Sequence, residues 1–123
     1  MTRILHLAER ELWRSAQKSG QYTQSTRGAL LEDIGFIHCS SLQQLPVVAS
    51  FIYADYTGEL VILELDDAAI AHAGVEIRSE DGGNGELYPH LYGALQCDWV
   101  KNTYAAMMDN GRLVASVLYE EQR

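Results

Sequence analysis

The segment ELVILELD, residues 59–66, decides the fold class of this 123-residue chain. In an extended conformation, alternate residues point to opposite sides, and here both sides are apolar. One side carries Val61, Leu63 and Leu65, and the other carries Leu60 and Ile62. A strand that is apolar on both faces must be covered on both faces, so we expect residues 59–66 at the centre of a sheet. The apolar run RILHL (3–7) predicts a first strand that is also buried on both faces.

Two helices are expected in the first half of the chain. Residues 8–20 carry Glu9 and Glu11 early, Lys18 late and a glycine at the end, which is the charge order that a helix dipole favours. The second helix runs to about Tyr53. It opens on one of two capping-box patterns, Ser41 with Gln44 or Ser40 with Gln43. Pro46 predicts either a bend in this helix or a start at Pro46 itself.

The remaining segments indicate strands and connections. Residues 21–35 are polar and predict a long loop, with a turn of helix at 28–32, and residues 36–40 predict a short strand. Residues 67–74 predict a short helical turn, and 81–85 a flexible link. Strands or extended segments are expected at 75–80, 86–95, 98–108 and 112–120, with a hairpin turn at Asn110-Gly111. The order predicts an α+β fold with two helices packed on a largely antiparallel, split sheet.

Composition limits the function classes. A hydrophobic content of 47% supports one domain with a real core, and no apolar run approaches the ~18–20 residues that span a bilayer. The charged N-terminal segment argues against a signal peptide, so we expect a cytoplasmic protein that does not bind membranes. A net charge of −8 argues against a nucleic-acid partner. We expect a monomer or weak dimer.

The cysteines give no sign of a metal site. Cys39 and Cys97 form no CxxC or zinc motif, and a bacterial-type cytosol would keep both reduced. The simplest interpretation of each is a small buried hydrophobe. No HExxH or other dense ligand motif accompanies the histidines, so we expect no metal.

Four polar residues interrupt apolar strands and are the candidates for chemistry: His6, His38, Glu80 and His90. Imidazole titrates near neutral pH, which suits acid–base catalysis, although a single buried histidine more often only satisfies the core. Ser40 either lies in this site or caps a helix. Arg78 shares a strand face with Glu80 and either forms a surface ion pair or meets a ligand phosphate, whereas Tyr92 either packs at the rim or stacks on a flat ring.

Four spaced segments resemble a known family: 4–26 (ILHLAERELWRSAQKSGQYTQST), 35–53 (GFIHCSSLQQLPVVASFIY), 60–66 (LVILELD) and 77–93 (IRSEDGGNGELYPHLYG). Together they resemble domain-of-unknown-function family 952 over residues 3–105, within a single domain 1–123. The C-terminal hairpin or extension, 106–123, lies outside the resemblance. Three positions depart from the family pattern: Ser79 replaces an aromatic residue, Tyr88 replaces Phe, and GAL (93–95) replaces GPL.

By analogy of fold, the resemblance implies an ADP-ribosyltransferase-like domain. Such domains place a His on the first strand, an aromatic or His on a second strand, and a catalytic Glu on a later one, to which His6, His38 or Tyr92, and Glu80 would correspond. The implied function is binding of NAD or an ADP-ribose-like nucleotide in a His/Glu-lined cleft, with glycosidic-bond cleavage or ADP-ribosyl transfer. NAD would be a substrate rather than a tightly bound cofactor.

The expected site therefore has two groups of residues. The catalytic candidates are His38, Glu80 and His90, and the substrate-binding candidates are His6, Ser40, Arg78 and Tyr92. Two alternatives stay open from the sequence. One is a metal-free phosphoesterase-like hydrolase that uses His38 and His90, and the other is a non-catalytic protein-interaction module. Whether the chain is an enzyme is left open at this stage.

Overall fold

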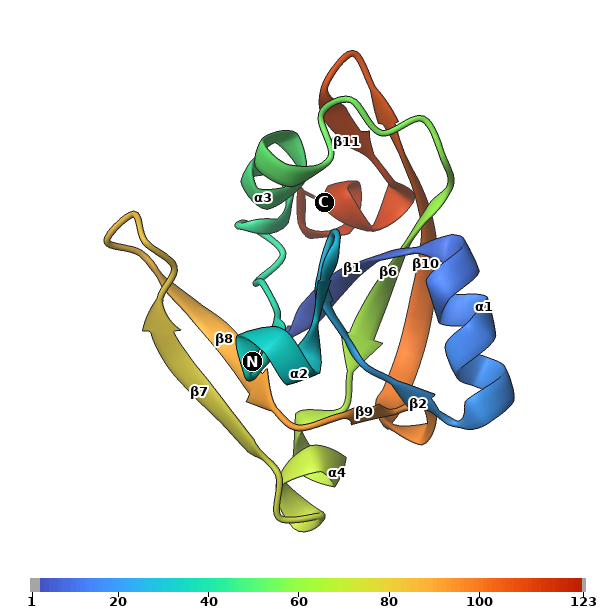
Figure 1. The fold of residues 1–123 in the computed structure, drawn as a ribbon. Coiled ribbons are helices and arrows are strands. Elements are labelled where there is room, and N and C mark those ends of the chain that lie inside the picture. Colours follow the sequence, from blue (N-terminus) through green and yellow to red (C-terminus); the bar gives the residue numbers. More distant parts are fainter. Residues whose placement is uncertain (1–2, 123) are drawn as a thin grey trace.

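The computed structural model describes residues 3–122, which form an α+β fold with antiparallel pairing between the strands (Figure 1). The helices of this described part are α1 (Arg10–Ser19), α2 (Leu31–Ile34), α3 (Leu45–Ile52) and α4 (Asp67–His72), with 3-10 turns η1 (Cys97–Trp99) and η2 (Ser116–Gln122). The longer strands are β1 (Leu5–Glu9), β6 (Leu60–Leu65), β7 (Glu76–Asp81), β8 (Leu87–Tyr92) and β10 (Val100–Asp109). The shorter strands are β2 (Gln21–Tyr22), β3 (Gln24–Thr26), β4 (Ala29–Leu30), β5 (Ile37–His38), β9 (Leu95–Gln96) and β11 (Arg112–Val114).

The larger sheet has the strand order β1-β6-β10-β11. Every residue of β6 is buried, and the strand lies between β1 and β10, so the central strand predicted at 59–66 is confirmed. The first strand is also confirmed, because the four consecutive residues 5–8 of β1 are all buried, which means that both faces of the strand are covered.

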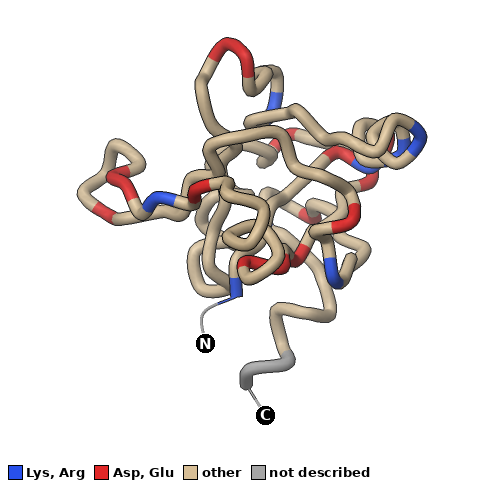
Figure 2. The backbone as a smooth tube through the Cα atoms, turned by 90° about the horizontal axis from the view of Figure 1, so that it is seen from below, with Lys and Arg blue, Asp and Glu red and all other residues tan. Residues whose placement is uncertain are grey.

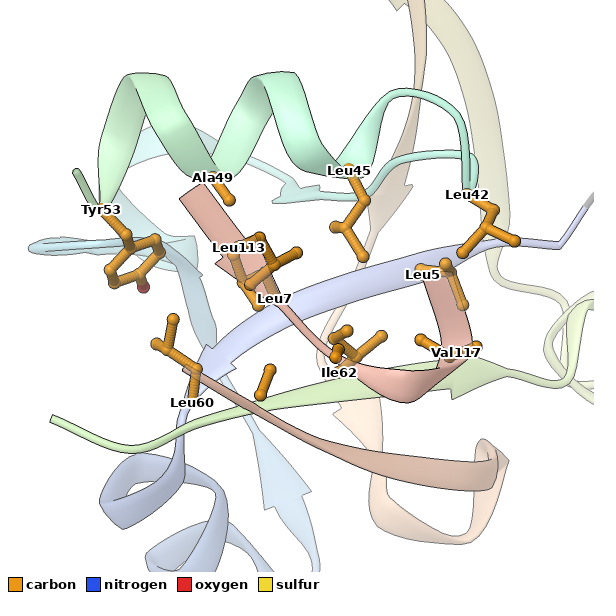
Figure 3. Close-up of a cluster of buried hydrophobic side chains, with 12 residues drawn as sticks. Leu5, Leu7, Leu42, Leu45, Ala49, Tyr53, Leu60, Ile62, Leu113 and Val117 are labelled. Atoms are coloured by element: carbon orange, nitrogen blue, oxygen red, sulfur yellow. The ribbon is translucent and has the colours of Figure 1, made fainter. Parts of the chain in front are cut away.

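Helix α3 covers one face of this sheet (Figure 3). Leu45 and Ala49 point from the helix toward Leu7 and Ile62 of the sheet, and these side chains belong to one buried cluster. A capping box forms in the turn that leads into α3. The Ser41 amide donates to Gln44 Oε1 at 2.9 Å, and the Gln44 amide donates to Ser41 Oγ at 3.2 Å. Of the two predicted patterns, the pair at 41 and 44 therefore forms.

The proline does not bend α3. Pro46 lies in the first turn, where a missing amide donor costs no helical hydrogen bond, and the helix begins at Leu45. On the other face of the sheet, α1 packs Trp13 and Ala16 against a second buried cluster that includes Leu63. This helix ends at Gly20, whose φ of 90° is the left-handed conformation that a helix terminus often requires.

The second sheet, of order β5-β8-β7, projects from the body as a long hairpin beside β5 (Figure 1). It is joined to the larger sheet through the backbone. The Leu5 amide donates to the Ser40 carbonyl at 2.8 Å, and the Ser40 amide donates to the Leu5 carbonyl at 2.7 Å. This bridge lies two residues after the end of β5, so residues from the two sheets meet at that end of the strand.

Two sequence-based predictions of local structure are wrong. Residues 21–35 are not one long loop, because they contain β2, β3 and β4; strands of two or three residues are too short to show a periodic pattern. The turn of helix expected at 28–32 is present, shifted to α2 (Leu31–Ile34). Residues 112–120 do not form one strand, because β11 ends at Val114 and the chain turns into η2. Ala115 and Val117 nevertheless pack into the buried cluster that includes Leu45 and Ile62. No helix among residues 3–122 has the length and apolar character needed to cross a membrane.

Candidate active site

One face of the β5-β8-β7 sheet carries most of the predicted site residues. Directly paired residues in antiparallel strands project to the same side, and the register pairs His38 with His90 and His90 with Arg78. The register also pairs Glu80 with Tyr88. We call this surface the polar face; it comprises His38, Arg78, Glu80, Tyr88, His90 and Tyr92. The opposite face carries Ile37, Ile77 and Leu91, which pack into the second hydrophobic cluster.

Glu80 links two residues of the neighbouring strand. The Tyr92 hydroxyl donates to Glu80 Oε1 at 2.5 Å, and His90 Nδ1 lies 2.9 Å from the same oxygen. The hydrogen bond from Tyr92, followed by that from His90, holds the pKa of the Glu80 carboxyl below its ordinary value. Glu80 is therefore a carboxylate at neutral pH, and its side chain remains partly exposed.

The bond to Glu80 also determines where the His90 proton lies. A carboxylate only accepts, so Nδ1 of His90 carries the hydrogen, and in the neutral ring Nε2 holds the free electron pair. This Nε2 atom is buried and has no hydrogen-bond partner among the described residues. A buried ring nitrogen without a partner is unusual, because most buried polar atoms are satisfied. His90 thus has the form of a base that is oriented by a carboxylate.

A second imidazole lies beside the first. The ring centroids of His38 and His90 are 4.9 Å apart, and their planes are nearly perpendicular at 83°. Phe36 stacks on His90 at 3.9 Å between ring centroids and presents itself edge-on to His38. Burial, and then the neighbouring His90, lower the pKa of His38 below its ordinary value. His38 is therefore neutral at pH 7, and no other described residue hydrogen-bonds to its ring.

His6 lies behind His38 rather than on the polar face. Its Nδ1–H donates to the His38 carbonyl at 2.5 Å, and its Nε2 accepts from the Tyr22 hydroxyl at 2.8 Å. The side chain is 2% exposed, and burial lowers the pKa of His6 to about 4. The same burial raises the pKa of Tyr22, so both partners stay neutral. Both nitrogens of His6 are thus engaged inside the protein.

Arg78 is paired with a neighbour on its own strand. Its Nε donates to Glu76 Oε2 at 2.6 Å, and its Cζ lies 4.4 Å from the centroid of the Tyr92 ring. The pair is exposed to solvent, so a ligand can compete for the guanidinium. The structure places Arg78 at the outer border of the polar face, next to Tyr92.

A pocket of about 490 Å³ opens beside the polar face. The predicted residues His38 and Ser40 line it together with Cys39, the α3 residues Val47, Val48, Phe51 and Ile52, the turn residues Gly82, Gly83 and Asn84, and Tyr88. The structure therefore brings His38 and Ser40 to the pocket wall, with Glu80, His90 and Tyr92 on the adjoining sheet surface. The α3 wall was not anticipated from the sequence, although Val47 and Phe51 have the i, i+4 spacing of one helix face.

Within residues 3–122, no three His, Cys, Asp or Glu side chains are grouped so that they could hold a metal ion. The two cysteines are free, and burial raises the pKa of Cys39 to about 12, which keeps this thiol protonated. What the polar face does offer is a neutral imidazole, a second imidazole oriented by a carboxylate, and aromatic rings. These are the groups of metal-free acid–base chemistry.

Comparison with known families supports the resemblance seen in the sequence. A family model described as "Protein of unknown function (DUF952)" matches residues 7–103. The chain belongs to the DUF952 family. The match includes every residue of the polar face and ends before the C-terminal hairpin is complete.

Solved structures similar in fold include those of protein CC0527. The crystal structure of protein CC0527 from Caulobacter crescentus matches with a TM-score of 0.77 and 24% identity, over 92% of this chain and 94% of that one. The solution NMR structure of the same protein matches with a TM-score of 0.72 and 25% identity, over 91% of each chain. None of the curated proteins matches. The likeness to CC0527 concerns the fold.

Proposed function

We propose that the polar face is the active site of an enzyme that binds NAD or an ADP-ribose-like nucleotide and cleaves or transfers at its N-glycosidic bond. The observation that carries this proposal is Glu80, a partly exposed carboxylate that Tyr92 and His90 orient and keep ionised. Oxocarbenium-like transition states are stabilised by a fixed negative charge of this kind. The ADP-ribosyltransferase-like fold that the family resemblance implies belongs to the same proposal.

The reaction needs few groups beyond this carboxylate. In NAD hydrolysis the bond between C1′ of the ribose and the nicotinamide nitrogen breaks, and its electron pair leaves with the neutral nicotinamide. Glu80 stabilises the positive charge that develops on the ribose. Water attacks C1′ and gives its proton to a base, so that the products are nicotinamide, ADP-ribose and H⁺.

His38 is the proposed base. Its lowered pKa leaves the ring neutral at pH 7, and its nitrogens have no described partner that would block proton transfer. His90 is the second candidate, because Glu80 holds its Nδ1 proton and leaves the Nε2 electron pair free. Substrate binding is assigned to Ser40 on the pocket wall, to Tyr92 as a flat surface, and to Arg78 for a phosphate. His6 supports His38 from behind.

The test is release of nicotinamide from NAD by the purified chain, followed by chromatography, with calorimetric binding of NAD, ADP-ribose and nicotinamide. Glu80→Gln keeps the shape of the side chain but removes its charge, so we expect turnover to fall ~100-fold or more. Glu11→Gln is the matched control, because Glu11 is an exposed carboxylate on α1. No binding of any of the three ligands and no turnover would refute the proposal.

A second candidate function rests on the imidazole pair. Two histidines 4.9 Å apart, one of them backed by a carboxylate, can act as acid and base on a phosphoester without metal. The test is turnover of cyclic and linear phosphodiesters in the presence of a chelator. This function is favoured if the wild type hydrolyses a phosphodiester but not NAD, and His38→Ala loses the phosphodiesterase activity. Equal phosphodiester turnover by His38→Ala and the wild type would exclude it.

A further inference from the structure

We infer that the pocket between α3 and the β7–β8 turn binds a planar heterocycle that is neutral or cationic, and that any phosphates of the ligand lie outside it. The inference rests on the proposed function in one respect, because it takes the heterocycle to be the base end of the nucleotide. It assigns ligand contact to residues outside the predicted set, chiefly Phe51 and Tyr88.

The floor of the pocket is a fixed aromatic ring. Tyr88 is 7% exposed, and its hydroxyl accepts from Asn84 Nδ2 at 3.1 Å. The backbone of Gly82 lies directly against this ring: a Cβ at Gly82 would be 2.5 Å from Tyr88 Cδ1 and 2.6 Å from Cε1. Glycine at this position therefore allows the turn to close on Tyr88. A ring held on one side by backbone presents a preorganised surface on its other side.

The opposite wall is apolar and exposed. Val47 is 64% exposed and Phe51 is 90% exposed, although both line the pocket from one face of α3. Single exposed apolar residues are common, but two that face the same hollow are typical of a binding surface. A flat ring that enters between Phe51 and Tyr88 would remove apolar surface of Phe51 from water and gain aromatic contacts.

The charges around the pocket oppose a phosphate. None of the described residues that line it is a lysine or an arginine. The hairpin that forms one side carries four carboxylates, Glu76, Glu80, Asp81 and Glu86, against the single cation Arg78, and it is the lobe at the left of Figure 2. A polyanion in the pocket would meet this negative charge, whereas a neutral ring would not and a pyridinium cation would be attracted.

The glycine-rich turn is also closed to anions. Backbone amides in such turns often cradle phosphates. Here Asp81 Oδ1 already accepts from the Gly83 amide at 2.7 Å and from the Gly85 amide at 3.1 Å. The turn is thus filled by a carboxylate of its own strand. The groups that remain for the edge of a heterocycle are the His38 ring and the Ser40 hydroxyl, neither of which hydrogen-bonds through its side chain to another described residue.

The experiment is an NMR titration of the full chain with nicotinamide, adenosine and inorganic pyrophosphate as separate probes. We expect nicotinamide or adenosine to shift the amide signals of Phe51, Gly82 and Gly83, and pyrophosphate to leave them unchanged. Phe51→Ala should weaken binding of the heterocycle about three- to tenfold, because one stacking surface is lost. Met107→Ala is the matched control, since Met107 is 53% exposed on β10, away from the pocket lining.

The outcomes separate this inference from the proposed function. Heterocycle shifts at the pocket without turnover of NAD support the inference and count against the enzyme. The inference is overturned if Phe51→Ala leaves the turnover of NAD unchanged and the heterocycles cause no shifts at Phe51, Gly82 or Gly83. The proposed enzymatic function would still hold in that case. Pyrophosphate shifts at Gly82 and Gly83 as large as those of the heterocycles would also overturn it.

Discussion

His6 holds the backbone of His38: its Nδ1–H donates to the His38 carbonyl at 2.5 Å, from a different sheet. The Tyr22 hydroxyl completes the arrangement by donating to Nε2. The first-strand histidine is therefore placed to position the strand that carries His38, and it does so as a neutral ring with a defined tautomer. The predicted ligand contact of His6 stays a prediction, but the positioning contact is present without any ligand.

Replacing His6 should cost stability even though no charge is lost. His6→Leu leaves the Tyr22 hydroxyl and the His38 carbonyl without a partner, so we expect a loss of about 1–3 kcal/mol in the free energy of unfolding. The measurement is urea denaturation at pH 7.5. His72→Leu, an exposed position in α4, should change the same quantity by less than about 0.5 kcal/mol. Equal effects of the two substitutions would contradict the positioning role.

The same histidine should make stability depend on pH. The pKa of His6 falls from an ordinary value of 6.5 to about 4 in the folded protein, so between these values the unfolded chain binds the extra proton. The stability that neutral His6 contributes is fully present above about pH 6.5. As the pH falls toward 4, the free energy of unfolding decreases by about 3 kcal/mol in total on account of His6. Urea denaturation of the wild type and His6→Leu at pH 7.5, 5.5 and 4.5 measures it. The difference between the two proteins should shrink toward acid pH, and a constant difference would refute this.

An element of the fold could be predicted where its pattern depends on residues that are close together in the sequence. Strand β6 was predicted because its apolar residues lie on both faces, and the capping pair before α3 because Ser41 and Gln44 are three residues apart. Both signals are local. The short strands β2, β3 and β4 were missed because two or three residues cannot show a period, and their pairing partners decide them.

The candidate site was predicted in part for the same reason. Alternation placed His38, His90 and Glu80 on strands, but only the pairing of β5 and β7 with β8 brings them to one face. The orientation of His6 toward the His38 carbonyl depends on a contact 32 residues away in sequence. Phe51 was missed because an apolar residue at helical spacing indicates core, whereas this one is 90% exposed.

Gly82 should tolerate no side chain. In Gly82→Ala the new Cβ would overlap the Tyr88 ring, which the buried surroundings and Asn84 hold in place, so we expect a loss of about 1–3 kcal/mol and a disturbed pocket. Gly93→Ala is the matched control: its Cβ would lie 3.2 Å from Val75 Cγ1, a contact that a small shift relieves. Thermal unfolding measures both. A Gly82→Ala protein as stable as Gly93→Ala would show that Tyr88 is not fixed.

Tyr92 should control the ionisation of Glu80. The hydrogen bond from the Tyr92 hydroxyl is the largest cause of the lowered Glu80 pKa, so Tyr92→Phe should raise the pKa of this carboxyl toward its ordinary value. A lowered pKa keeps Glu80 charged as the pH falls, and in Tyr92→Phe the carboxylate is instead protonated at a higher pH. NMR titration of the Glu80 side-chain carbon measures the shift directly and needs no substrate.

The same change should appear in any activity that requires the Glu80 carboxylate. The acid limb of the rate profile should move to higher pH in Tyr92→Phe, because the charged form disappears earlier on acidification. Tyr119→Phe, which removes an exposed hydroxyl distant in sequence from this sheet, should leave both the titration and the profile in place. If Tyr92→Phe leaves the Glu80 titration unchanged, the hydrogen bond does not set the charge state, and the argument that the polar face presents a preorganised carboxylate loses its support.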